Sequence, residues 1–213
     1  MKTDKMKKAY ILIAPGFEIL EAAAPVDVLE RCSIEVEKVA VCGEMDGKIF
    51  GKTDLLIPSS HNVFIKADSF LSDMADVERI ASDGAMVILP GGFPGYRNLS
   101  SNPLVGKLLQ EYEKRGRLIA AICGAPSALS TFHILEGSKL TCHSSVKDIL
   151  TAEKGGIPGY VYTGRPAEKD GRLITGRGAG VCMEFAFACA EALVSQEVIA
   201  EVKKKMEMTL LQP

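Results

Sequence analysis

Three short, almost wholly apolar runs constrain the fold of this chain more than any other feature of its sequence. They are AYILIA (residues 9–14), AMVILP (85–90) and LIAAI (118–122). Runs of this length are typical of strands that are buried on both faces of a parallel sheet. Each is followed, directly or after a loop, by a segment of helical character. Strands that alternate with helices predict a doubly wound, mostly parallel α/β sheet, in which ligands bind beyond the carboxyl ends of the strands.

Turn and capping residues divide the rest of the chain into further elements. Asp46-Gly47 is the strongest short signal for a β-hairpin. Asn102 and Pro103 suit the cap and the first position of a helix that Gly116 ends. The segments YVYTGR and GRLITGR are expected to pair across the polar turn EKDG (168–171). The pattern predicts helices over about 18–31, 72–81, 103–115, 145–154, 180–194 and 196–206, strands over 35–43, 63–68 and 139–143, and a glycine-rich loop over 91–102.

The composition bounds the class of protein. Apolar residues make up 47% of the chain and charged residues 24%, as in soluble globular proteins. The 213 residues are expected to form a single domain, and the net charge of −2 gives no electrostatic case for nucleic acid. The lysine-rich start precedes an apolar run too short for a secretory signal, and no later run is long enough to span a bilayer. We therefore expect a cytoplasmic protein that binds neither nucleic acid nor a membrane.

The six cysteines and three histidines are scattered along the chain. No pair of cysteines has CxxC or zinc-finger spacing, and without a secretory signal a disulfide framework is not expected. The sequence therefore predicts no metal site.

Cys123 occupies the most distinctive position among the candidate reactive residues. It lies between the apolar run 118–122 and the helical segment PSALSTF, where Gly124 and Ala125 keep the corner small. A sharp strand-to-helix turn of this kind is a nucleophile elbow, which exposes the reactive atom at the end of a sheet. The adjacent helix N-terminus favours a thiolate over a thiol. The alternative is a buried cysteine that only fills the core.

Two further features follow the carboxyl ends of predicted strands and should share a crevice with Cys123. Gly91-Gly92 lets backbone N–H groups approach a ligand or an oxyanion, although an isolated pair of glycines also suits a plain turn. Glu21 lies one turn into its helix; if it turns inward, burial would raise its pKa and make it a proton shuttle near neutral pH. His143, at the end of another strand, completes a Cys/His/Glu set or serves as an ordinary loop residue.

In combination, six motifs resemble the ThiJ/PfpI superfamily, in the branch of the parkinsonism-associated protein (DJ-one) and bacterial YajL. The motifs run in order through nearly the whole chain: GFEILEAAAPVDVL, VILPGGFPG, LIAAICGAPSAL, TCHSSVKD, EKDGRLITGRGAG and EFAFACAEAL. The resemblance implies a flavodoxin-like, three-layer α/β/α sandwich with a nucleophile elbow, usually assembled as a homodimer and working without a cofactor.

The resemblance also implies roles for individual residues. The family's reactive cysteine falls on Cys123 and the glutamate that contacts its sulfur on Glu21, with the pocket histidine on His143. The oxyanion and substrate-binding positions fall on the segments Gly91-Gly92 and Gly124-Ala125. Gly124 replaces the histidine that follows the cysteine in protease-like relatives, which argues against a peptidase.

The activities of similar proteins imply two functions. The first is a glutathione-independent glyoxalase or protein deglycase that acts on a small dicarbonyl such as methylglyoxal or glyoxal, with a protective role in carbonyl and oxidative stress. The second is a redox sensor or chaperone-like protein in which Cys123 is oxidised to the sulfinic acid. Both need a reactive sulfur beside a carboxyl group, so sequence alone does not separate them. A kinase or synthase of thiazole phosphate, which the older name of the family suggests, finds little support, because the chain has no P-loop and no basic phosphate cluster.

Overall fold

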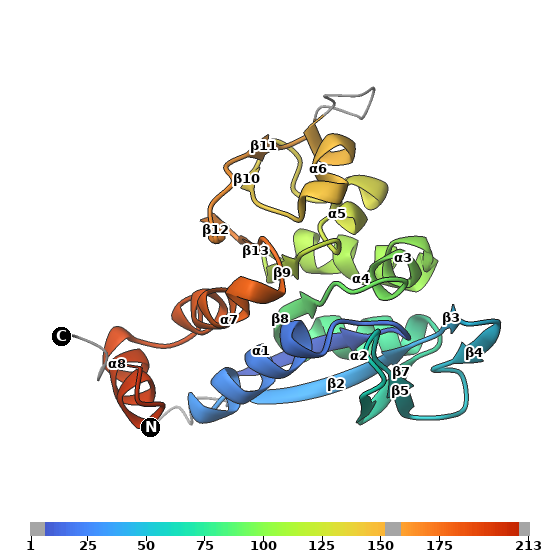
Figure 1. Ribbon diagram of the computed structural model, residues 1–213, viewed down its shortest axis with the longest axis horizontal. Helices are drawn as coiled ribbons and strands as arrows, with labels where there is room; N and C mark the ends of the chain where they lie inside the picture. The colour runs from blue at the N-terminus through green and yellow to red at the C-terminus, as the bar shows by residue number, and fades with distance from the viewer. Residues whose placement is uncertain (1–6, 152–158, 209–213) are drawn as a thin grey trace.

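A seven-stranded sheet forms the centre of the computed structural model, which describes residues 7–151 and 159–208 (Figure 1). The three apolar runs become the adjacent strands β1, β8 and β9, as their buried character predicts. Only β12, at one edge, is antiparallel to its neighbour. In spatial order the strands are β12 (Ala167–Asp170), β13 (Leu173–Gly176), β9 (Leu118–Ile122), β8 (Gly84–Leu89), β1 (Lys8–Ile13), β2 (Glu35–Val41) and β7 (Ser69–Leu71).

Helices cover both faces of this sheet and bury a separate core on each side. Alternate residues of β1 point to opposite faces, so Tyr10 and Leu12 pack with α2 and α4, whereas Ile11 and Ile13 pack with α1 and α7. This is the expected three-layer, flavodoxin-like α/β/α sandwich. The helices are α1 (Ile19–Arg31), α2 (Met74–Asp83), α3 (Gly95–Ser101), α4 (Pro103–Lys114), α5 (Ser127–Phe132), α6 (Ser144–Thr151), α7 (Cys182–Glu191) and α8 (Gln196–Lys205), with a short 3-10 turn at Ala179–Val181.

Three small β units project from the sandwich. The Asp46-Gly47 turn joins β3 (Gly43–Met45) to β4 (Lys48–Phe50), which confirms the predicted hairpin. Both turn residues have positive φ, 52° and 74°, as this type of turn requires. The other two units are the antiparallel pair β5 (Leu56–Pro58) and β6 (Phe64–Lys66) and the parallel pair β10 (Lys139–Leu140) and β11 (Val161–Tyr162).

The expectation of a plain loop over 91–102 was wrong, because Gly95–Ser101 forms the helix α3. Its glycine, asparagine and serine residues have low intrinsic helix propensity. Tertiary contacts stabilise it instead: Leu99 is fully buried in the core, and the Asn98 side chain donates hydrogen bonds to two backbone carbonyl groups of other segments. The adjoining prediction is confirmed, since the Asn102 side chain caps α4 at the N–H of Leu104.

Two strand pairings also differ from the prediction. The segment YVYTGR does not pair with GRLITGR: its strand β11 pairs with β10, and β12, within the expected turn, pairs with β13 across Gly171-Arg172. The strand expected over 63–68 pairs only with β5, and the following segment SFL supplies the edge strand β7 of the main sheet. Such pairings depend on distant partners that local periodicity does not encode. The expected helix over 145–154 corresponds to α6, and its last three residues lie outside the described ranges.

Candidate active site

The elbow places Cys123 at the carboxyl end of β9 in a strained backbone conformation. Its φ is 64°, which side-chain-bearing residues seldom adopt and which costs about 1–3 kcal/mol. Hydrogen bonds anchor it on both sides: its N–H donates to Gly176 O at 2.9 Å, and its carbonyl accepts from the His143 N–H at 2.8 Å. The side chain is partly exposed. Cys123 is therefore held at the end of the strand, partly exposed, with part of its side chain packed against the core.

Glu21 turns inward from α1 and is fully buried. Its Oε2 accepts a hydrogen bond from the Gly91 N–H at 2.8 Å, whereas Oε1 has no hydrogen-bond partner of regular geometry. Burial raises the pKa of Glu21 to about 7, although contacts with the Cys123 thiol and the Gly91 N–H act in the opposite direction. The carboxyl group is therefore protonated and ionised in similar amounts near neutral pH.

The pKa of Cys123 moves in the direction opposite to the one expected from the helix N-terminus. Burial, and then the negative charge of Glu21, raise it to about 12, while the N–H groups of Gly124 and Gly92 lower it through hydrogen bonds to the sulfur. The carboxylate thus opposes a thiolate beside it. Because the two groups share one negative charge, a thiolate forms only while Glu21 carries the proton.

At two positions of this site, neighbouring atoms lie so close to the backbone that only glycine fits. A Cβ on Gly91 would lie 2.7 Å from both the Cβ of Cys123 and Oε2 of Glu21. A Cβ on Gly124 would lie 2.7 Å from the Tyr96 ring, so the structure has no space for the histidine of the protease-like relatives. The backbone of both residues can therefore approach the reactive groups without a side chain in the way.

The four predicted oxyanion or substrate-binding residues have different positions in the structure. Gly92 and Gly124 direct their N–H groups at the sulfur, as the resemblance implies. The N–H of Gly91 instead holds Glu21. Ala125 does not contribute a donor: its N–H donates to Ile122 O at 3.0 Å within the turn, and its side chain is fully buried.

His143 lies beside Cys123 with its ring held by α6. Its Nδ1 is 2.8 Å from the Ser145 hydroxyl and accepts the Ser145 N–H at 3.2 Å, so the neutral ring carries its proton on Nε2. A Cβ on Gly178 would lie 3.8 Å from Cδ2 of His143 and 4.0 Å from the Cys123 sulfur. Both side chains therefore flank the same small space.

Among residues 7–151 and 159–208, no group of three or more histidine, cysteine or acidic side chains is arranged to hold a metal ion. Within the same residues, no helix is long and apolar enough to cross a membrane.

Comparison with known proteins agrees with this geometry. The family model described as DJ-1/PfpI matches residues 7–192, most of the chain. The chain belongs to the DJ-1/PfpI family. A DJ-1/PfpI relative from Danio rerio, the Parkinson disease protein 7 homolog, is 36% identical over 92% of this chain and 95% of its own length. The glutathione-independent glyoxalase DJ-1 of Schizosaccharomyces pombe is 29% identical and covers 95% of this chain and 100% of its own.

Solved DJ-1 structures are also similar in fold. The crystal structure of Drosophila melanogaster DJ-1beta superposes with a TM-score of 0.79 at 35% identity, covering 95% of this chain and 98% of that one. Schizosaccharomyces pombe DJ-1 has a TM-score of 0.79 at 27% identity and covers 97% and 100% of the two chains. The resemblance read from the six motifs is thus confirmed for the family and its fold.

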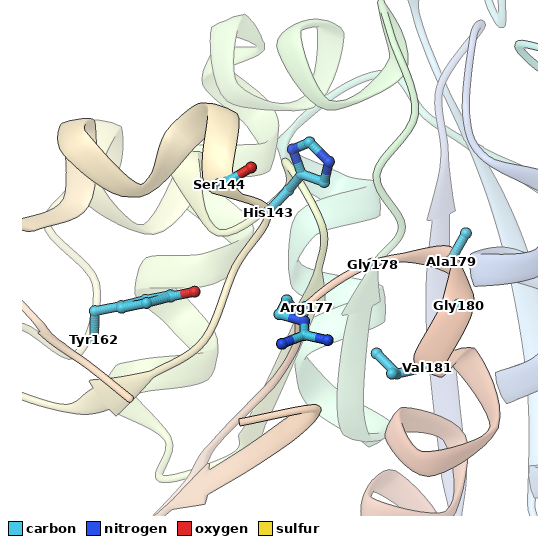
Figure 2. Close-up of a pocket in the computed structure, with 8 residues that line it drawn as sticks. All are labelled: His143, Ser144, Tyr162, Arg177, Gly178, Ala179, Gly180 and Val181. Carbon is cyan, nitrogen blue, oxygen red and sulfur yellow. The ribbon is translucent and has the colours of Figure 1, made fainter. Parts of the chain in front are cut away.

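Sequence reasoning missed a cavity of about 530 Å³ that this DJ-1/PfpI chain carries beside His143 (Figure 2). Arg177 and the following segment 178–181 form one side, and Ser144 of α6 and Tyr162 of β11 form the other. The motif TGRGAG contains Arg177, but nothing in its spacing indicates that α6 and β11 face it. The cavity becomes visible only when the folded chain brings together residues 143–144, residue 162 and residues 177–181, which are distant in sequence.

Proposed function

We propose that this protein is a cofactor-independent glyoxalase that converts methylglyoxal or glyoxal to lactate or glycolate without glutathione. Repair of early adducts of the same aldehydes on proteins, and protection in carbonyl and oxidative stress, extend this proposal. The observation that carries it is the contact between the Cys123 thiol and buried Glu21, whose pKa is raised to about 7. The relative from Schizosaccharomyces pombe that is named a glutathione-independent glyoxalase supports the reaction class.

In the proposed reaction, the proton of the Cys123 thiol passes to Glu21 as the sulfur adds to the aldehyde carbon of methylglyoxal. The Gly92 and Gly124 N–H groups stabilise the sulfur anion before addition and the alkoxide after it. Glu21 protonates the alkoxide to a hemithioacetal and then, as carboxylate, removes the proton from the former aldehyde carbon to form an enediol. Transfer of the hydroxyl proton to the neighbouring oxygen, together with return of the carbon-bound proton from Glu21 to the neighbouring carbon, gives a lactoyl thioester, and water releases lactate and the thiol. His143 assists the proton movement or orients the substrate.

The raised pKa of Glu21 predicts the pH dependence of this reaction. Below about pH 7 the pair holds both protons, so neither a thiolate nor a carboxylate base is available. We expect kcat/KM for methylglyoxal to fall about tenfold per pH unit below that point and to level off above it. Initial rates of lactate formation between pH 5 and pH 9 test this, and a flat profile across pH 7 would contradict the assigned role of Glu21.

A second function, a redox sensor or chaperone-like protein, is favoured by the partial exposure of Cys123 beside the cavity. Two equivalents of peroxide would oxidise the thiol first to sulfenic and then to sulfinic acid, releasing two waters. Protonated Glu21 and the N–H groups of Gly92 and Gly124 would hydrogen-bond the sulfinate. Intact mass after mild peroxide treatment tests this: without an adduct of two oxygens on Cys123, the sensor proposal fails.

We also propose that the protein acts as a single domain in the cytoplasm and assembles as a homodimer. All six cysteines are free, which fits a reducing compartment. The support for a dimer is a set of exposed apolar side chains on α1 and the β5–β6 hairpin. Ala23, Val26 and Phe64 line one groove together with charged residues of both signs, and Leu20 of α1 and Leu56 of β5 are also exposed.

Phe64→Glu is expected to convert the dimer to a monomer, because it places a charge among these exposed apolar side chains. The Phe64 side chain is 49% exposed, so the folded monomer should tolerate the change. Light scattering coupled to size-exclusion chromatography measures the mass. Met74→Glu makes a similar change on α2, where the side chain is 55% exposed, and should leave the dimer intact. A monomeric wild-type protein, or a dimeric Phe64→Glu variant, would contradict the proposed interface.

A further inference from the structure

The cavity beside Cys123 is larger than methylglyoxal requires. Its volume of about 530 Å³ lies within the range of pockets that hold drug-sized ligands, whereas methylglyoxal has three carbons. Gly178, one of the residues that line the cavity, lies next to the reactive sulfur, because a Cβ on this residue would lie 4.0 Å from it. A substrate whose carbonyl carbon meets Cys123 can therefore extend into this space.

The cavity is positively charged. Arg177 is one of its eight lining residues, and none of the eight is a carboxylate. Arg177 also follows directly after Gly176, the residue whose carbonyl accepts the Cys123 N–H, so it is fixed near the elbow.

The Arg177 guanidinium contacts no carboxylate among the described residues, a feature that it shares with Arg97, Arg117 and Arg172. Arg31, Arg79 and Arg115 each contact a carboxylate within 2.8 Å. Arg177 donates only to Gly164 O, at 3.3 Å, and within the described ranges it forms no ion pair. Its remaining guanidinium donors are thus available at the cavity, where they match the geometry of a carboxylate or a phosphate.

Hydroxyl groups complete the same surface. Figure 2 shows the Tyr162 ring with its hydroxyl directed toward the side where Arg177 lies, and Ser144 at the start of α6 across the cavity. Both can donate hydrogen bonds to an anion.

We propose that this cavity is a subsite for an anionic group, a carboxylate or a phosphate, on the substrate whose aldehyde reacts with Cys123. The preferred substrate class is then a 2-oxoaldehyde with a negatively charged tail, bound by Arg177 with help from Tyr162 and Ser144. This inference rests on the proposed glyoxalase function for its substrate, but the subsite itself can be tested without turnover.

The kinetic test compares one acid with its neutral ester. Dioxovalerate, a 2-oxoaldehyde with a terminal carboxylate, and its methyl ester differ in the charge that the subsite is proposed to bind and in one methyl group. We expect kcat/KM to favour the acid at least about tenfold in the wild-type protein, and Arg177→Gln to remove this preference. Lys169→Gln, the same change of charge at an exposed residue of β12, should retain it. Equal values for acid and ester, or a preference that survives in Arg177→Gln, would overturn the proposal.

A second measurement separates failure of the subsite from failure of the glyoxalase function. Levulinate has the same carboxylate tail but no aldehyde, so it can bind without reacting. It should slow alkylation of Cys123 by iodoacetamide in the wild type more than methyl levulinate does, and Arg177→Gln should abolish the difference. Inorganic phosphate replaces levulinate in a parallel series to distinguish the two anions. If neither anion protects Cys123, the subsite is refuted even if methylglyoxal is turned over; Arg177-dependent protection upholds it even if no lactate forms.

Discussion

Replacement of Glu21 by glutamine should abolish lactate formation and, at the same time, stabilise the folded protein above neutral pH. The expected loss of kcat/KM is on the order of 100-fold or more, because glutamine can neither accept the thiol proton nor move a proton between the two substrate carbons. The amide can still accept the Gly91 N–H, which is 2.8 Å from the carboxylate oxygen, so the site should keep its shape.

The gain in stability follows from the sign of the pKa shift. Folding raises the pKa of Glu21 from 4.5 to about 7, so ionisation favours the unfolded chain. The stability that protonated Glu21 contributes to the folded protein is fully present below pH 4.5 and is lost as the pH rises through about 7. The free energy of unfolding falls by about 3 kcal/mol over this range. Glutamine avoids this loss. Urea denaturation of Glu21→Gln and the wild type should therefore show a difference in unfolding free energy of about 3 kcal/mol at pH 8 and much less at pH 5.

A matched control is Glu201→Gln, which makes the same change at an exposed position on α8. It should lack the large gain at pH 8 and keep full activity. If Glu21→Gln is no more stable than the wild type at pH 8, the burial of an ionisable carboxyl group is not the source of its raised pKa. If it retains full activity, another group moves the proton.

The parts of the fold that could be predicted are those in which local sequence and final environment agree. AYILIA, AMVILP and LIAAI are apolar at nearly every position, and in the structure both faces of β1, β8 and β9 are covered by helices. The shared location of the reactive residues also followed from topology, because Cys123 directly follows β9, Gly91 lies two residues after β8, and Glu21 lies on the helix that follows β1. Parallel strands bring their carboxyl ends to one edge of the sheet.

The errors arose where distant contacts decide the local structure. The helix α3 forms from residues of low helix propensity because Leu99 enters the core and Asn98 links it to two other segments. Likewise, β11 pairs with β10 rather than with the strand nearer in sequence. The alternation pattern of a short segment does not specify its partner.

The direction of the Cys123 pKa was mispredicted for a related reason. Position at a helix N-terminus can be read from sequence, but the burial of the sulfur and its contact with Glu21 cannot, and these two effects are the larger ones. The proposed role of Arg177 was missed because the cavity that it lines is also lined by Ser144 and Tyr162, which come from other elements. Site chemistry in this protein therefore depends on distances that only the folded chain defines.

Cys123→Ser is expected to have the largest effect of any single substitution on activity. A hydroxyl is a far weaker nucleophile than a thiol at neutral pH, and no other described cysteine lies at the elbow. The loss should be about 1,000-fold or more, the range seen when a nucleophile is removed. Serine is close to cysteine in size, so the urea midpoint should change little.

The most direct measurement is lactate formation from methylglyoxal in the complete absence of glutathione, with wild-type protein and Cys123→Ser side by side. The proposed mechanism predicts lactate from the wild type and none above background from the folded variant. Equal rates for the two proteins, or no lactate from a folded and reduced wild type, would contradict the assignment of Cys123 as the nucleophile of a glyoxalase.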